Sequence, residues 1–214
     1  MQILSVNVAR VVQVEINGRA VSTGIYKEPV AGEVWLRKLG FDGDEQADLT
    51  VHGGLYQAAY CYPSEHYGHW QNRLNRSDPL PFGTFGENLT SVGLLETEVF
   101  IGDVYRFGSA LVQVTAPRLP CMKFAHKIGR PDLLKEFLHS GHSGLYLRVL
   151  EEGGVSAGDE IKLVERDPRR ISVRTLLGLQ KLSEGDDNAV RIALSIPALA
   201  PGAKRALQAR AAGV

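Results

Sequence analysis

The stretch EVFIGDVYRFGSALVQVT, residues 98–115, decides the fold class. It holds three short apolar runs, which a Gly-Asp pair and a Gly-Ser pair separate. Runs of β-branched and aromatic residues divided by glycine turns predict a β-meander. Similar runs at 11–16, 32–39, 145–150 and 160–165 predict four more strands. Short strands without alternating helices predict a mainly β protein, built around a closed or nearly closed β-barrel.

Two peripheral helices interrupt this β body. Pro63 and Pro131 each open one, because proline fits the first turn of a helix and apolar residues recur behind both at helical spacing. Three short helices are expected after residue 170, near 173–182, 186–195 and 201–212, where glycine and proline residues separate them.

The C-terminal part of the chain also differs in charge. Residues 1–166 are expected to form the barrel domain, and residues 169–214 a small three-helix module beside it. Residues 1–165 carry 15 Lys and Arg against 20 Asp and Glu, a net charge of −5. Residues 166–214 carry nine against four, a net charge of +5. This asymmetry indicates either a docking surface or a solvated helical face.

Composition excludes several classes of protein. Hydrophobic residues make up 44% of the chain and charged residues 22%, as in ordinary globular domains. No run is long enough to span a membrane, and the N-terminal MQIL lacks the features of a signal peptide, so the cytoplasm is the expected location. Two cysteines are too few for a secreted disulfide framework. The basic residues are scattered and lack a recognition motif, so no nucleic-acid partner is expected.

The most distinctive candidate site is TAPRLPCMK, residues 115–123. Two prolines stiffen the chain around Arg118, and the second one is a suitable first residue for a short helix with Cys121 in its first turn. The helix dipole, Arg118 and Lys123 would then favour the thiolate, which suits a nucleophile or a soft-metal ligand. The alternative is a small buried hydrophobic residue, which is the interpretation for Cys61.

Polar clusters fall in the expected loops at 22–27, 43–48, 51–54 and 85–89. The first places a lysine beside hydroxyl groups, an arrangement compatible with a phosphate. Each cluster taken alone is more typical of a turn than of a site.

Taken in order, these pieces resemble the MOSC-domain family, named for the C-terminal domain of molybdenum cofactor sulfurase, and most closely its YiiM-like subgroup. The matching pieces are GDEQA (43–47), VHGG (51–54), YPSEHY (62–67), FGENL (85–89), IGD (101–103) and PRLPCMK (117–123). No single piece is specific, but their order and spacing together are.

The resemblance implies a MOSC-type β-barrel that binds the molybdenum cofactor, a molybdopterin, with Cys121 as the protein ligand to the metal. It implies a cationic rim for the anionic pterin phosphate, polar residues lining the pocket, and one candidate proton donor. The residues expected in these roles are Lys27, Arg118 and Lys123 on the rim, His52, Asn88 and Thr115 in the lining, and Glu87 as the proton donor.

The implied reaction is the two-electron reduction of N-hydroxylated compounds such as hydroxylamino-purine base analogues, a detoxification. The sequence has no flavin, haem or iron–sulfur motif, so the electrons are expected from a separate reductase, a flavoprotein or another carrier. The basic C-terminal segment is the expected docking surface. Two alternatives remain open: a non-enzymatic carrier of molybdopterin or of sulfur on Cys121, and a metal-free thiol enzyme with Cys121 as nucleophile.

Overall fold

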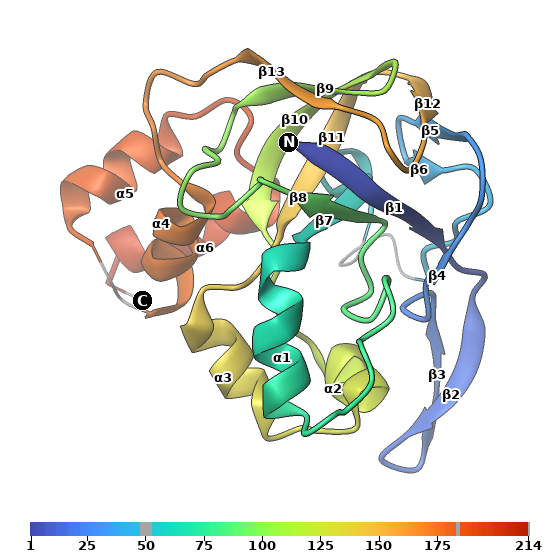
Figure 1. Cartoon of the computed structure of the whole chain (residues 1–214). Helices are drawn as coiled ribbons and strands as arrows, with labels where there is room; N and C mark the ends of the chain where they lie inside the picture. The colour runs from blue at the N-terminus through green and yellow to red at the C-terminus, as the bar shows by residue number, and fades with distance from the viewer. Residues whose placement is uncertain (48–52, 183–184, 214) are drawn as a thin grey trace.

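The computed structural model describes residues 1–47, 53–182 and 185–213. Eight strands form the main sheet (Figure 1), namely β1 (Gln2–Val8), β4 (Glu28–Pro29), β7 (Ala59–Pro63), β8 (Leu89–Val92), β9 (Val104–Phe107), β10 (Ala110–Pro117), β11 (Leu145–Glu151) and β13 (Ile161–Glu165). Their spatial order is β13-β9-β10-β11-β7-β8-β1-β4. All neighbouring pairs are antiparallel except β7 with β8, which needs a crossover connection.

The sheet curls, but it does not close. The backbone N–H of Ile3 donates to Asp159 O (2.9 Å) and that of Ile161 to Met1 O (2.9 Å), so β1 approaches the chain that leads into β13. Among the described residues, a single isolated bridge, Gln2 with Glu160, joins β1 to the chain just before β13. The expected closed barrel is therefore corrected to an open, curled sheet, because the strands share too few residues across this gap to form a ladder.

The expected meander is present in two of its three strands. β9 and β10 pair across a turn at Gly108, whose φ is +55° and where an added Cβ would lie 2.4 Å from the carbonyl oxygen of Gly154. The prediction of a third strand at 99–101 is wrong: within these three residues only Phe100 makes a β-bridge, to Ser172. Val99 and Ile101 are buried in the core without a neighbouring strand, so apolarity alone misled the prediction.

Two smaller sheets flank the main one. β12 (Gly153–Val155), β5 (Val34–Arg37) and β6 (Gly40–Phe41) form the first. β2 (Val12–Ile16) and β3 (Arg19–Thr23) form a hairpin that extends away from the main sheet (Figure 1). Its turn residues Asn17 and Gly18 both have positive φ, as tight hairpin turns require.

Three helices gather on one side of the sheet: α1 (Tyr67–Arg73), α2 (Met122–Ile128) and α3 (Leu133–Ser140) (Figure 1). Short 3-10 segments lie at Leu55–Gln57 and Ser64–His66, and the second leads from Pro63 into α1, as expected. Aromatic side chains fill the space between these helices and the sheet. They are Tyr60, Tyr62, Tyr67, Trp70, Phe85, Phe124 and Phe137. The Cys121 side chain is partly buried and packs against this aromatic cluster.

The C-terminal segment contains α4 (Val173–Leu177), a π-helical turn at Gly178–Leu182, α5 (Asp187–Leu194) and α6 (Pro201–Ala211). Ser172 and Asp186 cap α4 and α5 by accepting backbone N–H groups, and Pro201 begins α6. The apolar side chains of these helices belong to the same buried core as those of the main sheet. The helices lie where the sequence places them, and the division of the chain after residue 166 into two domains stays a prediction.

Within the described ranges, no helix is long and apolar enough to cross a membrane.

Candidate functional site

One pocket brings together segments that lie far apart in the sequence. Residues from 23–27, 44–47, 57–60, 86–88 and 118–123 line it, together with Tyr146. The pocket is concave and open to solvent on one side, and concave sites of this kind are where small ligands bind. Five of the expected site residues contribute to the lining: Lys27, Asn88, Arg118, Cys121 and Lys123.

Cys121 lies at the N-terminal end of α2. It is the N-cap residue, and the helix begins at Met122, two residues later than a start at Pro120, so Cys121 precedes the first turn. The side chain is partly buried and lines the pocket. Cys61 is different, because it is fully buried and hydrogen-bonded to Ser91 (3.3 Å), and burial raises the pKa of the Cys61 thiol to about 12. The pocket thiol is therefore Cys121.

Arg118 is a buried cation held by aromatic rings. It is only 5% exposed, and its guanidinium carbon lies 4.7 Å from the ring centroid of Phe124 and 5.4 Å from that of Tyr60. Its Nη1 is buried and has no hydrogen-bond partner among the described residues. A buried charged donor without a partner is costly. The geometry therefore offers an N–H group to an acceptor that the described protein atoms do not supply, such as an anionic ligand.

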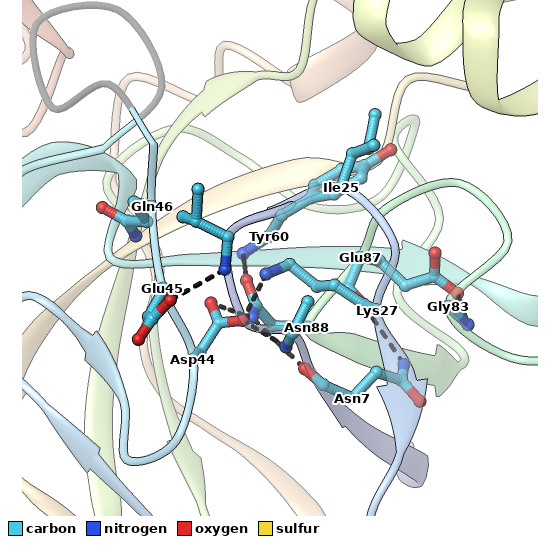
Figure 2. Close-up of polar contacts among 12 residues, drawn as sticks. Asn7, Ile25, Lys27, Asp44, Glu45, Gln46, Tyr60, Gly83, Glu87 and Asn88 are labelled. Carbon is cyan, nitrogen blue, oxygen red and sulfur yellow. Dashed lines mark hydrogen bonds and ion pairs between the residues drawn. The ribbon is translucent and has the colours of Figure 1, made fainter. Parts of the chain in front are cut away.

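The opposite wall is a polar network centred on Asp44 (Figure 2). Lys27 Nζ lies 2.5 Å from Asp44 Oδ1, and the same oxygen accepts the backbone N–H of Ala9 (2.9 Å). Asn88 Nδ2 donates to Asp44 Oδ2 (2.9 Å), and Asn88 Oδ1 accepts the backbone N–H of Tyr60 (3.2 Å). Burial lowers the pKa of Lys27, and Asp44 partly offsets this effect. Lys27 and Asn88 thus reach the pocket as parts of one connected wall.

Glu87 lies behind this wall and not in the lining. Its carboxylate is fully buried and accepts hydrogen bonds from the backbone N–H groups of Gly83 (2.8 Å) and Phe85 (2.9 Å), and from the hydroxyls of Thr90 (3.0 Å) and Tyr67. Burial raises the pKa of Glu87, against the effect of these donors. The structure gives Glu87 the position of a loop anchor, which does not fit the expected role of proton donor to the pocket.

The remaining expected residues differ in position. Lys123 is partly buried and lines the pocket. Thr115 does not line it: its hydroxyl is buried, within hydrogen-bond distance of the carbonyl oxygens of Tyr56 (2.6 Å) and Tyr146 (3.1 Å). His52 lies outside the described residues.

Sequence reasoning missed three contributors to this site. Tyr60 and Tyr146 form an aromatic wall, with ring centroids 5.6 Å apart. Asp44 organises the opposite wall, and the only sequence signal for it was its place in the GDEQA motif. Strand residues give no sign of which cavity they face until the sheet order is known.

A family model described as the MOSC domain matches residues 48–162. The chain belongs to the MOSC domain family. This MOSC protein is 45% identical over 172 residues to "Uncharacterized protein YflK" of Bacillus subtilis, covering 80% of this chain and 77% of the relative. It is 35% identical over 189 residues to "Protein YiiM" of Escherichia coli, covering 88% of this chain and 84% of the relative.

Two further similarities extend this result. A Gibberella moniliformis protein named "Reductase" is 34% identical over 173 residues, which cover 80% of this MOSC chain but 30% of the relative. The crystal structure of YiiM from Geobacillus stearothermophilus has a TM-score of 0.82 and 38% identity, with 98% of each chain covered. The fold of this MOSC protein, C-terminal helices included, is therefore similar to that of YiiM.

Proposed function

We propose that this protein is an oxidoreductase that binds the molybdenum cofactor and reduces N-hydroxylated compounds, such as hydroxylamino-purine base analogues. One observation carries the proposal: the pocket joins the thiol of Cys121 to the buried Arg118, whose Nη1 is unpartnered among the described residues. A thiolate suits a soft metal site, and a planar guanidinium suits a phosphate. The MOSC domain family is associated with binding of this cofactor.

The residues present fit such a group. Arg118, Lys27 and Lys123 supply positive charge for an anionic pterin, and Cys121 supplies the metal ligand. Asp44 offsets part of this charge, because it is paired with Lys27. When bound, the cofactor supplies the two-electron redox chemistry, which is the part of the reaction that side chains cannot perform.

The protein supplies binding and orientation. The reaction R–NHOH + 2e⁻ + 2H⁺ → R–NH₂ + H₂O breaks one N–O bond and consumes two protons. Tyr60 and Tyr146 offer an aromatic wall suited to a planar heterocyclic base. Burial raises the pKa of both phenols, and the Tyr60 hydroxyl donates to the carbonyl of Ser143 (2.9 Å), which fixes its ring in the wall. On the opposite side of the pocket, the hydrogen bond from Asn88 to Asp44 fixes the position of the polar wall.

The electrons are proposed to come from a separate reductase. The region shared with this chain makes up only 30% of the Gibberella relative named "Reductase". Most of that relative is therefore sequence outside the MOSC-like part, which supports the proposal that electrons come from a protein or domain other than the MOSC domain. The exposed cations Arg170, Lys204 and Arg205 of the C-terminal segment are the proposed docking groups. Reversing their charges is expected to slow electron delivery at low salt and leave cofactor content unchanged. The same reversals at Arg19, Arg76 and Lys162, which are exposed elsewhere, provide the control.

The proposed activity is tested with protein purified from a host that makes the cofactor. The loaded protein is mixed with 6-hydroxylaminopurine and a reduced viologen, and formation of the amine is followed beside Cys121→Ser. Turnover by the wild type alone is the expected result. Loaded protein that releases its pterin readily and turns over no N-hydroxylated substrate would contradict the proposal and indicate a carrier.

A further inference from the structure

Lys127 joins α2 to two loops of the pocket wall. Its Nζ donates to the carbonyl oxygens of Ile25 (2.9 Å) and Gly83 (2.5 Å). Ile25 belongs to the loop that supplies Lys27, and Gly83 belongs to the turn that leads to Gly86 and Asn88. One side chain therefore spans three segments that are distant in the sequence.

The two loops meet without space between their backbones. A Cβ added at Gly83 would lie 2.4 Å from the carbonyl oxygen of Lys27, and one at Gly86 would lie 2.7 Å from Ile25 Cγ1. Both glycines also have positive φ. Larger residues at Gly83 and Gly86 would force the loops apart, and Lys127 binds to both loops where they meet.

The helix at the other end of this link carries the pocket thiol. Cys121 caps α2, and Lys123 and Lys127 are four residues apart, so they lie on the same face of the helix. α2 has only seven residues, and so short a helix depends on tertiary contacts for its position. Phe124 provides one such contact in the aromatic cluster, and Lys127 provides the polar one.

We propose that Lys127 is a positioning residue, whose two hydrogen bonds fix α2, and with it Cys121 and Lys123, against the opposite wall of the pocket. The link acts on the protein alone, so it holds whether or not the proposed cofactor function is correct.

The charge of Lys127 is maintained at some cost. Burial, opposed by the nearby Glu87 and assisted by Lys27 and Arg118, lowers the pKa of Lys127 to about 8. A cation in such surroundings, with two carbonyl acceptors, is suited to a fixed structural link. A mobile surface lysine would not lose so much hydration.

The test measures how fast a thiol reagent modifies the full-length protein. Cys61 is 0% exposed, so the rate of reaction with 5,5′-dithiobis(2-nitrobenzoic acid) reports on Cys121. Rates are measured from pH 6 to 10 for the wild type, Lys127→Met, Lys127→Arg and Lys135→Met. Lys135 is an exposed lysine on α3 and serves as the matched control.

The plateau rate at high pH reports on access to the thiolate, and the midpoint of the profile reports on the local charge. Lys127→Met is expected to raise the plateau about tenfold, the change in a local opening equilibrium that loss of the two hydrogen bonds produces. Above pH 8 the neutral amine of the wild type still has two N–H groups to donate to these carbonyls. Lys127→Arg is expected to restore the wild-type plateau, and Lys135→Met to leave it unchanged.

Two results would overturn the proposal: a shifted midpoint with an unchanged plateau in Lys127→Met, or equal plateaus in the Met and Arg variants. Thermal unfolding confirms that each variant is folded before its rate is interpreted. If Lys127→Met does not fold, Lys127→Gln replaces it, and its amide, which can keep one of the two bonds, is expected to give an intermediate plateau. A wild-type plateau in the Gln variant would likewise overturn the proposal.

Discussion

Lys27 and Asp44 form a buried ion pair in the pocket wall, with 2.5 Å between Nζ and Oδ1 and side chains only 8% and 1% exposed. Asp44 also accepts hydrogen bonds from the backbone of Ala9 and the amide of Asn88. The pair therefore connects the end of β1, the loop after β3 and the loop before β8. Much of the pocket's shape depends on this one carboxylate.

Removing both partners of this pair is expected to destabilise the fold by less than the two single removals added together. Asp44→Asn should lower the free energy of unfolding by about 3 kcal/mol, because it leaves the Lys27 ammonium buried without a counter-charge. The double variant Lys27→Met/Asp44→Asn should lose less than the sum of the two single losses. Urea unfolding measures all four proteins of the cycle. Additive losses would show that the pair does not couple.

Lysine is not expected to replace Arg118 in binding the pterin. Arg118→Lys keeps the charge but loses the flat group that contacts Phe124 and the open Nη1 position. Pterin content per protein should fall about tenfold, equivalent to about 1.4 kcal/mol of charge-assisted hydrogen bonding. Fluorescence of the oxidised pterin measures it, with Lys123→Arg as the control that keeps its content. Full pterin content in Arg118→Lys would remove Arg118 from the binding site.

Glu87 is expected to matter for stability and not for proton transfer. Glu87→Gln should cost about 2 kcal/mol, because an amide N–H would then face groups that now donate to the carboxylate. Tyr67→Phe removes one of those donors and should cost about 1 kcal/mol. Urea unfolding measures both losses. A stable Glu87→Gln variant with a shifted pH–rate profile would instead restore the role of proton donor.

The histidine cluster near α1 is expected to make stability sensitive to acid. His142 stacks on His66, with ring centroids 3.9 Å apart, and His69 and Glu96 lie beside them. Burial, with a smaller effect of His66, lowers the pKa of His142 to about 4. Between about pH 4 and the usual value near 6.5 the unfolded chain binds more protons, so stability falls as pH decreases through this range.

His142→Gln should therefore unfold with a flatter pH dependence than the wild type. Because His142 is only partly buried, the expected difference between pH 6.5 and 4 is about 1 kcal/mol. Thermal unfolding across this range gives the difference between the two proteins at each pH. Parallel profiles would show that His142 does not contribute.

Much of the fold could be predicted because its strands and helices have strong local signals. The strands β9, β10, β11 and β13 read directly as apolar runs between glycine turns. β7 and β8 could not be found in this way. Every residue of β7 is buried, so the alternation that marks a strand is missing. The parallel pairing of β7 with β8 depends on the crossover through α1, which no local pattern encodes.

The candidate site was predicted where a residue type carries its own chemistry. Cys121 and Arg118 stood out through their turn and their charge, and the structure brings both into one pocket. Glu87 and Thr115 lie one layer deeper, since neighbours along a loop or a strand can face opposite sides of it. Lys127 had no sequence signal, because its partners are backbone carbonyls about 40 and 100 residues away.

The central claim is that Cys121 holds a molybdenum cofactor in this pocket. The most direct measurement is the molybdenum and pterin content of protein purified from a cofactor-competent host, with the wild type beside Cys121→Ser. We expect near-stoichiometric metal and pterin in the wild type and loss of the metal in the variant. Absence of both from the wild type, or equal metal content in the two proteins, would contradict the claim.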